Sequence, residues 1–282
     1  MHVQGLPERI GDEGVKMSTI NTFQISFEIW GCIIGLITCI LTGSVTFEAG
    51  DKGGKKLWVI VLINNLLLVS DAMAYIYRGD VTSLGTAITR VSNFSIFALE
   101  YVLVGIFVSY VLLIAGRETA PGKIWSIIAY GFLAAGAAGL IITPFTGLYY
   151  YFDAANRYCR GSGIALSFAT CGAVIAICVL ILWRSRRSMN RGEKNTFLIL
   201  ISLFAACLAG QFVFYGFSFI NFSITIAFLI LHLSSYSRLQ EMMTERKVEE
   251  AIRDTAALSE WSRNSLSSLE QKSGADYEEN KE

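Results

Sequence analysis

Long apolar runs alternate with short polar segments along most of the chain. A helix of about 20 apolar residues crosses a bilayer core about 30 Å thick, and the runs have this length. A longer apolar stretch, 196–236, suits two crossings and divides near residues 215–218. We therefore predict an all-α integral membrane protein whose residues 23–236 form a seven-transmembrane helix bundle. The runs before the double stretch span about 23–47, 57–77, 87–114, 124–142 and 164–183.

Composition supports the membrane class and argues against catalysis. Of the 282 residues, 53% are hydrophobic and only 16% are charged, which is unlike an ordinary soluble domain. Most of the six cysteines lie inside apolar runs, and their spacing suggests neither a disulfide framework nor a zinc site. No glycine-rich phosphate loop is present, and the last apolar run has no lysine for a retinal Schiff base. We expect no catalytic residues, no metal, no cofactor and no nucleic-acid partner.

The basic residues predict the orientation in the membrane. Cytoplasmic loops are enriched in lysine and arginine, and the segment RSRRSMNRGEK after the fifth run dominates that bias. This favours a cell-membrane protein with its N-terminus outside and its C-terminus in the cytoplasm. Residues 1–22 would be an extracellular tail without a cleavable signal, and Met17 is an alternative start.

The sequence changes character directly after the last apolar run. Residues 237–261 are charged and helix-permissive, and Glu249 and Arg253 have the spacing of a helical ion pair. We predict a cytoplasmic helix here, which either signals by pairing in a dimer or is a solvated extension. Residues 262–282 are rich in Ser, Glu, Asn and Lys, so we expect a disordered tail.

Polar and ionisable side chains inside the apolar runs are the candidates for function, because burying them in lipid is costly. Arg90, Asn93 and Glu100 have spacings that place them on one helix face. Two hypotheses follow: an outward-opening pocket for a small ligand, or a structural ion pair of Arg90 with Asp71 or Glu28 that locks the first three helices. The candidate ligand-binding residues are Glu28, Asp71, Arg90, Asn93, Glu100 and Gln211.

Aromatic residues gather in the loop between the fourth and fifth runs, FTGLYYYFDAANRYCRGSG. Tyr149, Tyr150, Tyr151 and Phe152 favour a strand, DAAN suits a turn, and RYCR suits a returning strand. This pattern predicts an external β-hairpin that covers the bundle as a lid. The alternative is an aromatic belt at the level of the lipid headgroups.

Several segments carry a family resemblance. The stretches LLVSDAMAYIYRGD, ITRVSNFSIFALEYVLVGIF and TPFTGLYYYFDAANRYCRG resemble the seven-helix N-terminal sensor domains of Firmicutes membrane signalling proteins. In that family a LytS-like histidine kinase or a diguanylate cyclase usually follows the membrane domain. This chain has no histidine box, ATP-binding motif or GGDEF signature after Glu250.

The resemblance implies a sensor without its own catalytic output, which would act on a separate histidine kinase or diguanylate cyclase or as a homodimer. A small-solute carrier or channel subunit is the alternative. A polar path that continues to the cytoplasmic side would favour the carrier, whereas the sequence concentrates its polar groups toward the outside.

Overall fold

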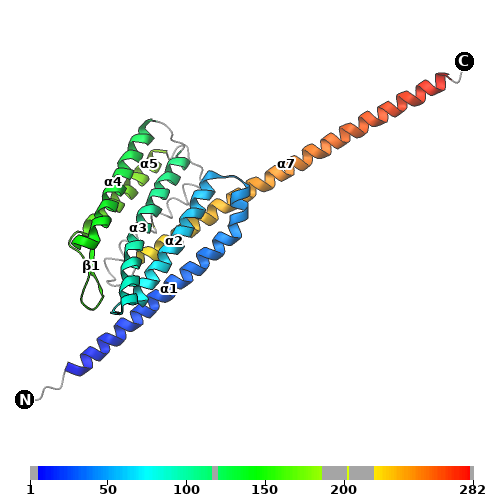
Figure 1. Cartoon of the computed structure of the whole chain (residues 1–282). Coiled ribbons are helices and arrows are strands. Elements are labelled where there is room, and N and C mark those ends of the chain that lie inside the picture. Colours follow the sequence, from blue (N-terminus) through cyan, green and yellow to red (C-terminus); the bar gives the residue numbers. More distant parts are fainter. Residues whose placement is uncertain (1–5, 116–119, 186–201, 203–218, 280–282) are drawn as a thin grey trace, which may run out of the picture. The chain divides into compact units, whose positions relative to one another are not determined.

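The computed structural model describes residues 6–115, 120–185, 202 and 219–279 (Figure 1). Within them, the chain is almost entirely helical, and five helices are long and apolar enough to cross a membrane. The all-α, membrane-type class predicted from the apolar runs is therefore confirmed. The predicted sixth crossing lies outside the described residues. The elements are α1 (Leu6–Glu48), α2 (Lys52–Ile76), α3 (Ser83–Ile114), α4 (Ala120–Thr146), β1 (Tyr150–Phe152), β2 (Tyr158–Arg160), α5 (Ile164–Ser185) and α7 (Phe219–Glu279).

The turns between the first three helices are capped by polar side chains. Gly50 adopts a left-handed conformation (φ 68°) that ends α1, and the Asp51 carboxylate then accepts hydrogen bonds from the backbone N–H of Gly53 (3.3 Å) and Gly54 (2.6 Å). Thr82 caps α3 by accepting from Gly85 N–H at 3.1 Å. These caps satisfy N–H groups that a helix leaves unpaired at its start, so the apolar runs begin and end at defined residues.

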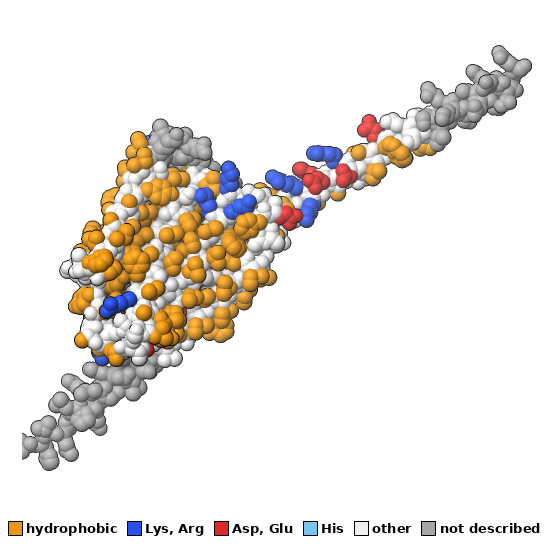
Figure 2. Space-filling view, in the orientation of Figure 1, with side chains coloured by type: hydrophobic (Ala, Val, Ile, Leu, Met, Phe, Trp, Pro, Cys, Tyr) orange, Lys and Arg blue, Asp and Glu red, His pale blue; other side chains and the backbone are white. Residues whose placement is uncertain are grey.

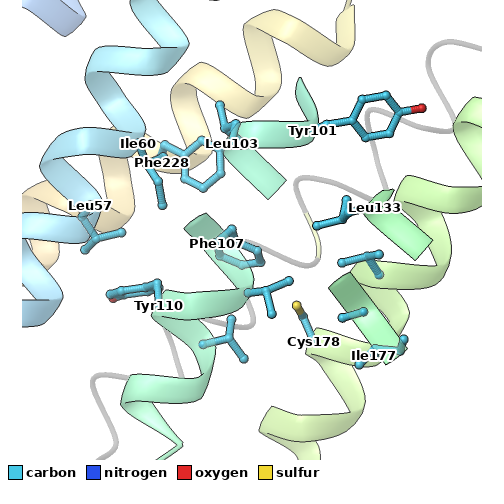
Figure 3. Close-up of a cluster of buried hydrophobic side chains, with 14 of the residues drawn as sticks. Leu57, Ile60, Tyr101, Leu103, Phe107, Tyr110, Leu133, Ile177, Cys178 and Phe228 are labelled. Carbon is cyan, nitrogen blue, oxygen red and sulfur yellow. The ribbon is translucent and has the colours of Figure 1, made fainter. Parts of the chain in front are cut away.

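The helices of the first compact unit, Met1–Tyr236, pack around a shared apolar core. In it α2 lies between α1 and α3, and α5 packs on both α3 and α4 (Figure 1). Figure 3 shows side chains from α2, α3, α4, α5 and α7 meeting in that core. Phe107 and Phe228 meet edge to face, with ring centroids 5.7 Å apart. The start of α7 therefore belongs to the same bundle as α3.

The outer surface of this unit is apolar as well. The visible face in Figure 2 is covered mainly by hydrophobic side chains. Trp30, Ile40 and Phe145 are exposed to 63%, 76% and 89%. A water-soluble protein rarely exposes so large an apolar surface, whereas lipid tails solvate it without cost. The surface thus agrees with the multi-pass membrane class.

Two terminal segments differ from the sequence-based predictions. The helix α1 begins at Leu6, so it includes most of the predicted tail 1–22. The helix α7 continues to Glu279 and includes most of the segment 262–282 that we expected to be disordered. The residues of that segment are helix-permissive and contain no proline, so the composition that predicted disorder is compatible with a solvated helix. The second compact unit begins at Ser237, where the sequence changes from apolar to charged.

Candidate functional site

One face of α1 is polar and turned into the bundle. Its buried positions recur at alternating spacings of four and three residues, the period of a helix seam. The opposite face is apolar and exposed, as at Ile33 and Ile37. This arrangement is expected in lipid, because polar groups find hydrogen-bond partners only inside the bundle. The buried seam of α1 consists of Gln24, Glu28, Gly31, Gly35, Thr38 and Thr42.

Three carboxyl groups from three helices come together near one end of this seam. Glu28 on α1 is only 2% exposed, and its Oε1 accepts a hydrogen bond from Gln24 Nε2 at 2.5 Å. The carboxyl of Glu28 lies beside that of Asp71 on α2, and Asp71 also interacts electrostatically with Glu100 on α3. We call Glu28, Asp71 and Glu100 the acidic layer. Three of the predicted site residues are thus brought together.

The predicted ion pair of Arg90 is wrong. Arg90 is exposed and makes no ion pair with the described residues. The buried face of α3 carries Thr89, Asn93 and Phe97. Arg90 follows Thr89 by one residue, which corresponds to a rotation of about 100° around the helix axis, so its side chain points away from that face. The sequence spacing correctly placed four side chains along one stripe of the helix, namely Arg90, Asn93, Phe97 and Glu100. It could not show how α3 is rotated about its axis, and therefore which edge of this stripe faces the bundle.

Asn93 takes a local role. It is buried, and its Nδ2 donates to the carbonyl of Thr89 at 2.8 Å, within its own helix. Thr89 in turn donates through Oγ1 to the carbonyl of Tyr77 at 3.0 Å. Thr89 therefore joins α3 to the end of α2, whereas the Asn93 bond stays within α3. The last predicted ligand-binding residue, Gln211, lies outside the residues that the structure describes.

Aromatic side chains from the segment after α4 pack on α3 near the acidic layer. Strands β1 and β2 pair antiparallel, with Phe152 opposite Tyr158. Tyr150 is 4% exposed and stacks on Phe97 of α3 with centroids 5.3 Å apart, and Tyr158 stacks on Tyr150 at 5.8 Å. Tyr158 also interacts electrostatically with Glu100. The ribbon therefore brings the Tyr158 side chain within electrostatic range of one of the three carboxyl groups.

The four aromatic residues predicted as a lid have unequal positions. Tyr149 is fully buried, and its hydroxyl donates to the carbonyl of Gly136 on α4 at 3.1 Å. Tyr150 faces the bundle, Phe152 packs against Tyr158, and Tyr151 is 51% exposed. This alternation follows from the period of two in a strand.

Two tyrosines of this site were absent from the predicted set. Tyr75 lies one helical turn after Asp71 and interacts electrostatically with Asp71, Glu28 and Tyr158. The spacing of Tyr75 from Asp71 was a usable signal, whereas Tyr158 is brought in only by the pairing of the strands. We call Tyr75, Tyr150 and Tyr158 the aromatic roof.

Tyr150 and Tyr158 remain protonated at ordinary pH. Burial raises the pKa of Tyr150 to about 12. Burial also raises the pKa of Tyr158 to about 12, although the neighbouring Arg160 guanidinium opposes this shift. Both hydroxyl groups therefore keep their proton, and the rings add no negative charge to the acidic layer.

A second buried polar group lies farther along the seam, toward the turn between α1 and α2. Asn64 Nδ2 donates to Thr225 Oγ1 of α7 at 2.8 Å. His232 of α7 is 1% exposed, and its Nε2 lies 2.7 Å from Thr42 Oγ1. The side chain of Asn65 packs against Gly35, where a Cβ atom would overlap it. Threonines and His232 therefore extend the polar seam beyond the end that carries the carboxyl groups.

Some atoms of this second group have no hydrogen-bond partner among the described residues. They are Asn64 Oδ1, both amide atoms of Asn65, and His232 Nδ1. No three His, Cys, Asp or Glu side chains of the described residues are grouped as a metal site would require. The polar seam is thus built for hydrogen bonding and charge interaction, with carboxyl groups at one end and amide, hydroxyl and imidazole groups at the other.

No protein-family model, no curated protein and no solved structure matches this chain.

Proposed function

We propose that this chain is a membrane-embedded sensor that passes a signal from a small ligand to a cytoplasmic partner. One observation carries the proposal: the carboxyl groups of α1, α2 and α3 interact electrostatically in the acidic layer, and they also interact with Tyr75 and Tyr158 of the aromatic roof. Charged groups are costly to keep in a membrane bundle without a role, so this layer is the natural place for recognition. The resemblance of the sequence to sensor domains of membrane signalling proteins supports the same function.

The proposed topology has seven crossings, with the N-terminus outside and the C-terminus in the cytoplasm of a cell membrane. The five apolar helices supply five crossings, and residues of the stretch 196–236 would supply two more. Lys52, Lys55 and Lys56 at the α1–α2 turn and Arg184 at the end of α5 would then be cytoplasmic. The β1–β2 ribbon would lie outside and act as a lid.

The topology is tested by labelling of single cysteines in a cysteine-free background. Lys52→Cys and Ala154→Cys report on the two sides, since Lys52 and Ala154 are both exposed. An impermeant thiol reagent on intact cells should label position 154 and leave position 52 unlabelled. Labelling of position 52 alone would reverse the orientation.

The proposed output is the part of α7 that follows Ser237. This second unit is a helix with exposed charges of both signs and with exposed apolar residues, among them Met242, Val248 and Ile252 (Figure 2). An isolated helix is marginally stable in water, so this segment should be helical when it pairs with a second copy or with a helix of a separate histidine kinase or diguanylate cyclase. A ligand can act on this pairing only if it binds the two states of the bundle with different affinities.

Crosslinking in native membranes tests the sensor function. Cysteines placed one at a time along 240–255 should crosslink with a helical period, or capture a signalling enzyme. The variant Asp71→Asn should change the pattern, whereas Asp254→Asn, an exposed control on α7 itself, should not. Absent crosslinks without a captured enzyme, or a pattern unaffected by Asp71→Asn, would refute this function.

A carrier is the second candidate, and the extended polar seam favours it. The seam continues from Glu28 to the contact between Thr42 and His232, so polar groups follow α1 through most of its apolar length. Transport needs such a path, while a receptor does not. Solute or proton uptake by proteoliposomes, lost in His232→Leu, would support the carrier in place of the sensor.

A further inference from the structure

We propose that His232 is the positioning residue of α7: its Nε2 donates a hydrogen bond to Thr42 and thereby fixes how far along α1 this helix lies. The bond between Asn64 and Thr225 fixes α7 in the same way on α2. The inference rests on the proposed function, because α7 is the proposed output, and it names the residue that sets the position of that helix.

Two hydrogen bonds lie on one face of α7. Thr225 and His232 are seven residues apart, which is about two helical turns, and they are 2% and 1% exposed. Thr225 Oγ1 accepts from Asn64 Nδ2 at 2.8 Å, and His232 Nε2 lies 2.7 Å from Thr42 Oγ1. The two bonds therefore join α7 to two different helices, at points about 10 Å apart along its axis.

A packing contact adds to the connection between α1 and α7. A Cβ atom at Gly31 would lie 3.7 Å from Thr225 Cγ2, so the methyl group of Thr225 faces α1. Gly31 precedes Thr42 as Thr225 precedes His232, and the two helices therefore run parallel. Along this parallel contact, a slide of α7 would change both of its polar contacts at once.

No neighbouring position of α7 keeps both bonds. One turn of a helix is three or four residues, so a slide by one turn would bring other side chains to the places of Thr225 and His232. Every pair that could replace them contains at least one Leu or Phe, which cannot form the bond. The pairs are Leu229 with Tyr236, Asn221 with Phe228, Phe228 with Ser235, and Phe222 with Leu229.

The donor in the bond between α7 and α1 follows from the second contact of Thr42. Its hydroxyl has one hydrogen, and Oγ1 also lies 2.7 Å from the carbonyl oxygen of Thr38, which can only accept. If the hydrogen points to Thr38, Nε2 of His232 carries a proton and donates to Thr42, so both contacts are hydrogen bonds. If it pointed to Nε2, the imidazole proton would lie on Nδ1, which has no partner among the described residues. A buried unpaired donor is costly, and the contacts therefore favour the proton on Nε2.

The imidazole is neutral in this arrangement. No charged side chain of the described residues interacts electrostatically with His232, and a buried imidazolium without a counter-ion would be unfavourable. A neutral ring with its proton on Nε2 can donate only in the direction of Thr42. His232 therefore acts as a directed donor from α7 to α1.

The proton position is tested by nuclear magnetic resonance of the full chain in lipid nanodiscs, with nitrogen-15 in its histidines. The chain has two histidines, and His2→Asn leaves the signals of His232. The spectrum should show a proton on Nε2 and none on Nδ1, and Thr42→Val should shift the Nε2 resonance. A proton on Nδ1, or a spectrum that Thr42→Val leaves unchanged, would overturn the assignment.

The position of α7 is measured as the distance between spin labels at Ser44→Cys and Leu233→Cys, two exposed sites, in a cysteine-free background. His232→Gln should keep the distance of the unchanged chain, because its amide nitrogen reaches the place of Nε2. His232→Asn is too short for this bond, so it should broaden the distance distribution by about 5 Å, the length of one helical turn. An unchanged distribution in His232→Asn, or an equal change in His232→Gln, would overturn the positioning role.

Variants of α1 test the same bond if His232→Asn does not fold. Thr42→Ser keeps the hydroxyl and should keep the distance, whereas Thr42→Val removes the hydroxyl and should broaden the distribution. Equal distributions in these two variants would also overturn the positioning role. Both measurements are made within the bundle and need no partner, so their failure leaves the crosslinking test of the sensor function intact.

Discussion

The turn between β1 and β2 offers the sharpest test of how the ribbon is held on the bundle. Asn156 is 5% exposed and has a left-handed backbone conformation, with φ 52°. Its Nδ2 donates to the carbonyl of Asp80 at 2.7 Å and to Thr89 Oγ1 at 3.2 Å. Its own carbonyl accepts from Gly79 N–H at 3.2 Å. One side chain therefore attaches the ribbon to the α2–α3 connection.

Two substitutions separate the conformational part from the hydrogen-bond part. Asn156→Gly keeps the left-handed backbone at no steric cost but loses both side-chain hydrogen bonds, which should lower the free energy of unfolding by about 1 kcal/mol. Asn156→Ala loses the same bonds and adds the left-handed penalty of about 1–2 kcal/mol, so the total should be about 2–3 kcal/mol. Asparagine tolerates this conformation better than alanine does.

The assay is reversible unfolding of the purified chain, followed by hydrogen exchange of the ribbon amides. Both variants should speed exchange over 150–160, with alanine the faster, while amides at the centre of α3 remain protected. Equal destabilisation by glycine and alanine would show that the turn is not left-handed in solution. If neither variant changes exchange or stability, the ribbon is held by other contacts and the reasoning fails.

Three further predictions concern packing, hydrogen bonding and pH. Gly35→Ala should lower the unfolding midpoint because its Cβ would overlap Asn65, whereas Gly172→Ala, with open space around it, should not; equal effects would contradict the close packing of α1 on α2. Thr42→Val should destabilise the bundle by about 1–3 kcal/mol because it leaves buried His232 without its partner. Ser44→Ala on the exposed face of α1 is its control, and a matching loss there would refute the Thr42–His232 bond. Because the pKa of Tyr150 and Tyr158 is raised to about 12 in the fold, from about 10 unfolded, their stabilisation is complete below pH 10 and is lost as the pH rises toward 12. Ultraviolet titration of tyrosinate, compared between the unchanged chain and the Tyr150→Phe and Tyr158→Phe variants, should assign a late ionisation to each of these two groups that reverts to an ordinary midpoint on unfolding. Early ionisation of both would contradict their burial.

Much of the fold could be predicted from local pattern. The first five apolar runs became five long helices because a bilayer requires each crossing to satisfy its own backbone hydrogen bonds. The ribbon strands lie where Tyr150–Phe152 and Tyr158–Arg160 have strand-favouring residues around a turn. Composition was a weaker guide for 262–282, because serine, glutamate and lysine are common to disordered segments and to solvated helices.

The site needed the tertiary structure. The sequence identified Glu28, Asp71 and Glu100 as candidates for the bundle interior, because a carboxyl group within an apolar run is costly to expose to lipid. It also suggested Arg90 as their partner, and the rotation of α3 by about one residue turned that side chain outward. Which polar side chain meets which is decided by how each helix is rotated about its axis, and one residue corresponds to about 100°. The electrostatic interaction of Tyr158 with Glu100 and the hydrogen bond of Asn156 to Asp80 depend on where the ribbon folds back on the bundle. Residues so far apart in the chain carry no local signal that they will meet.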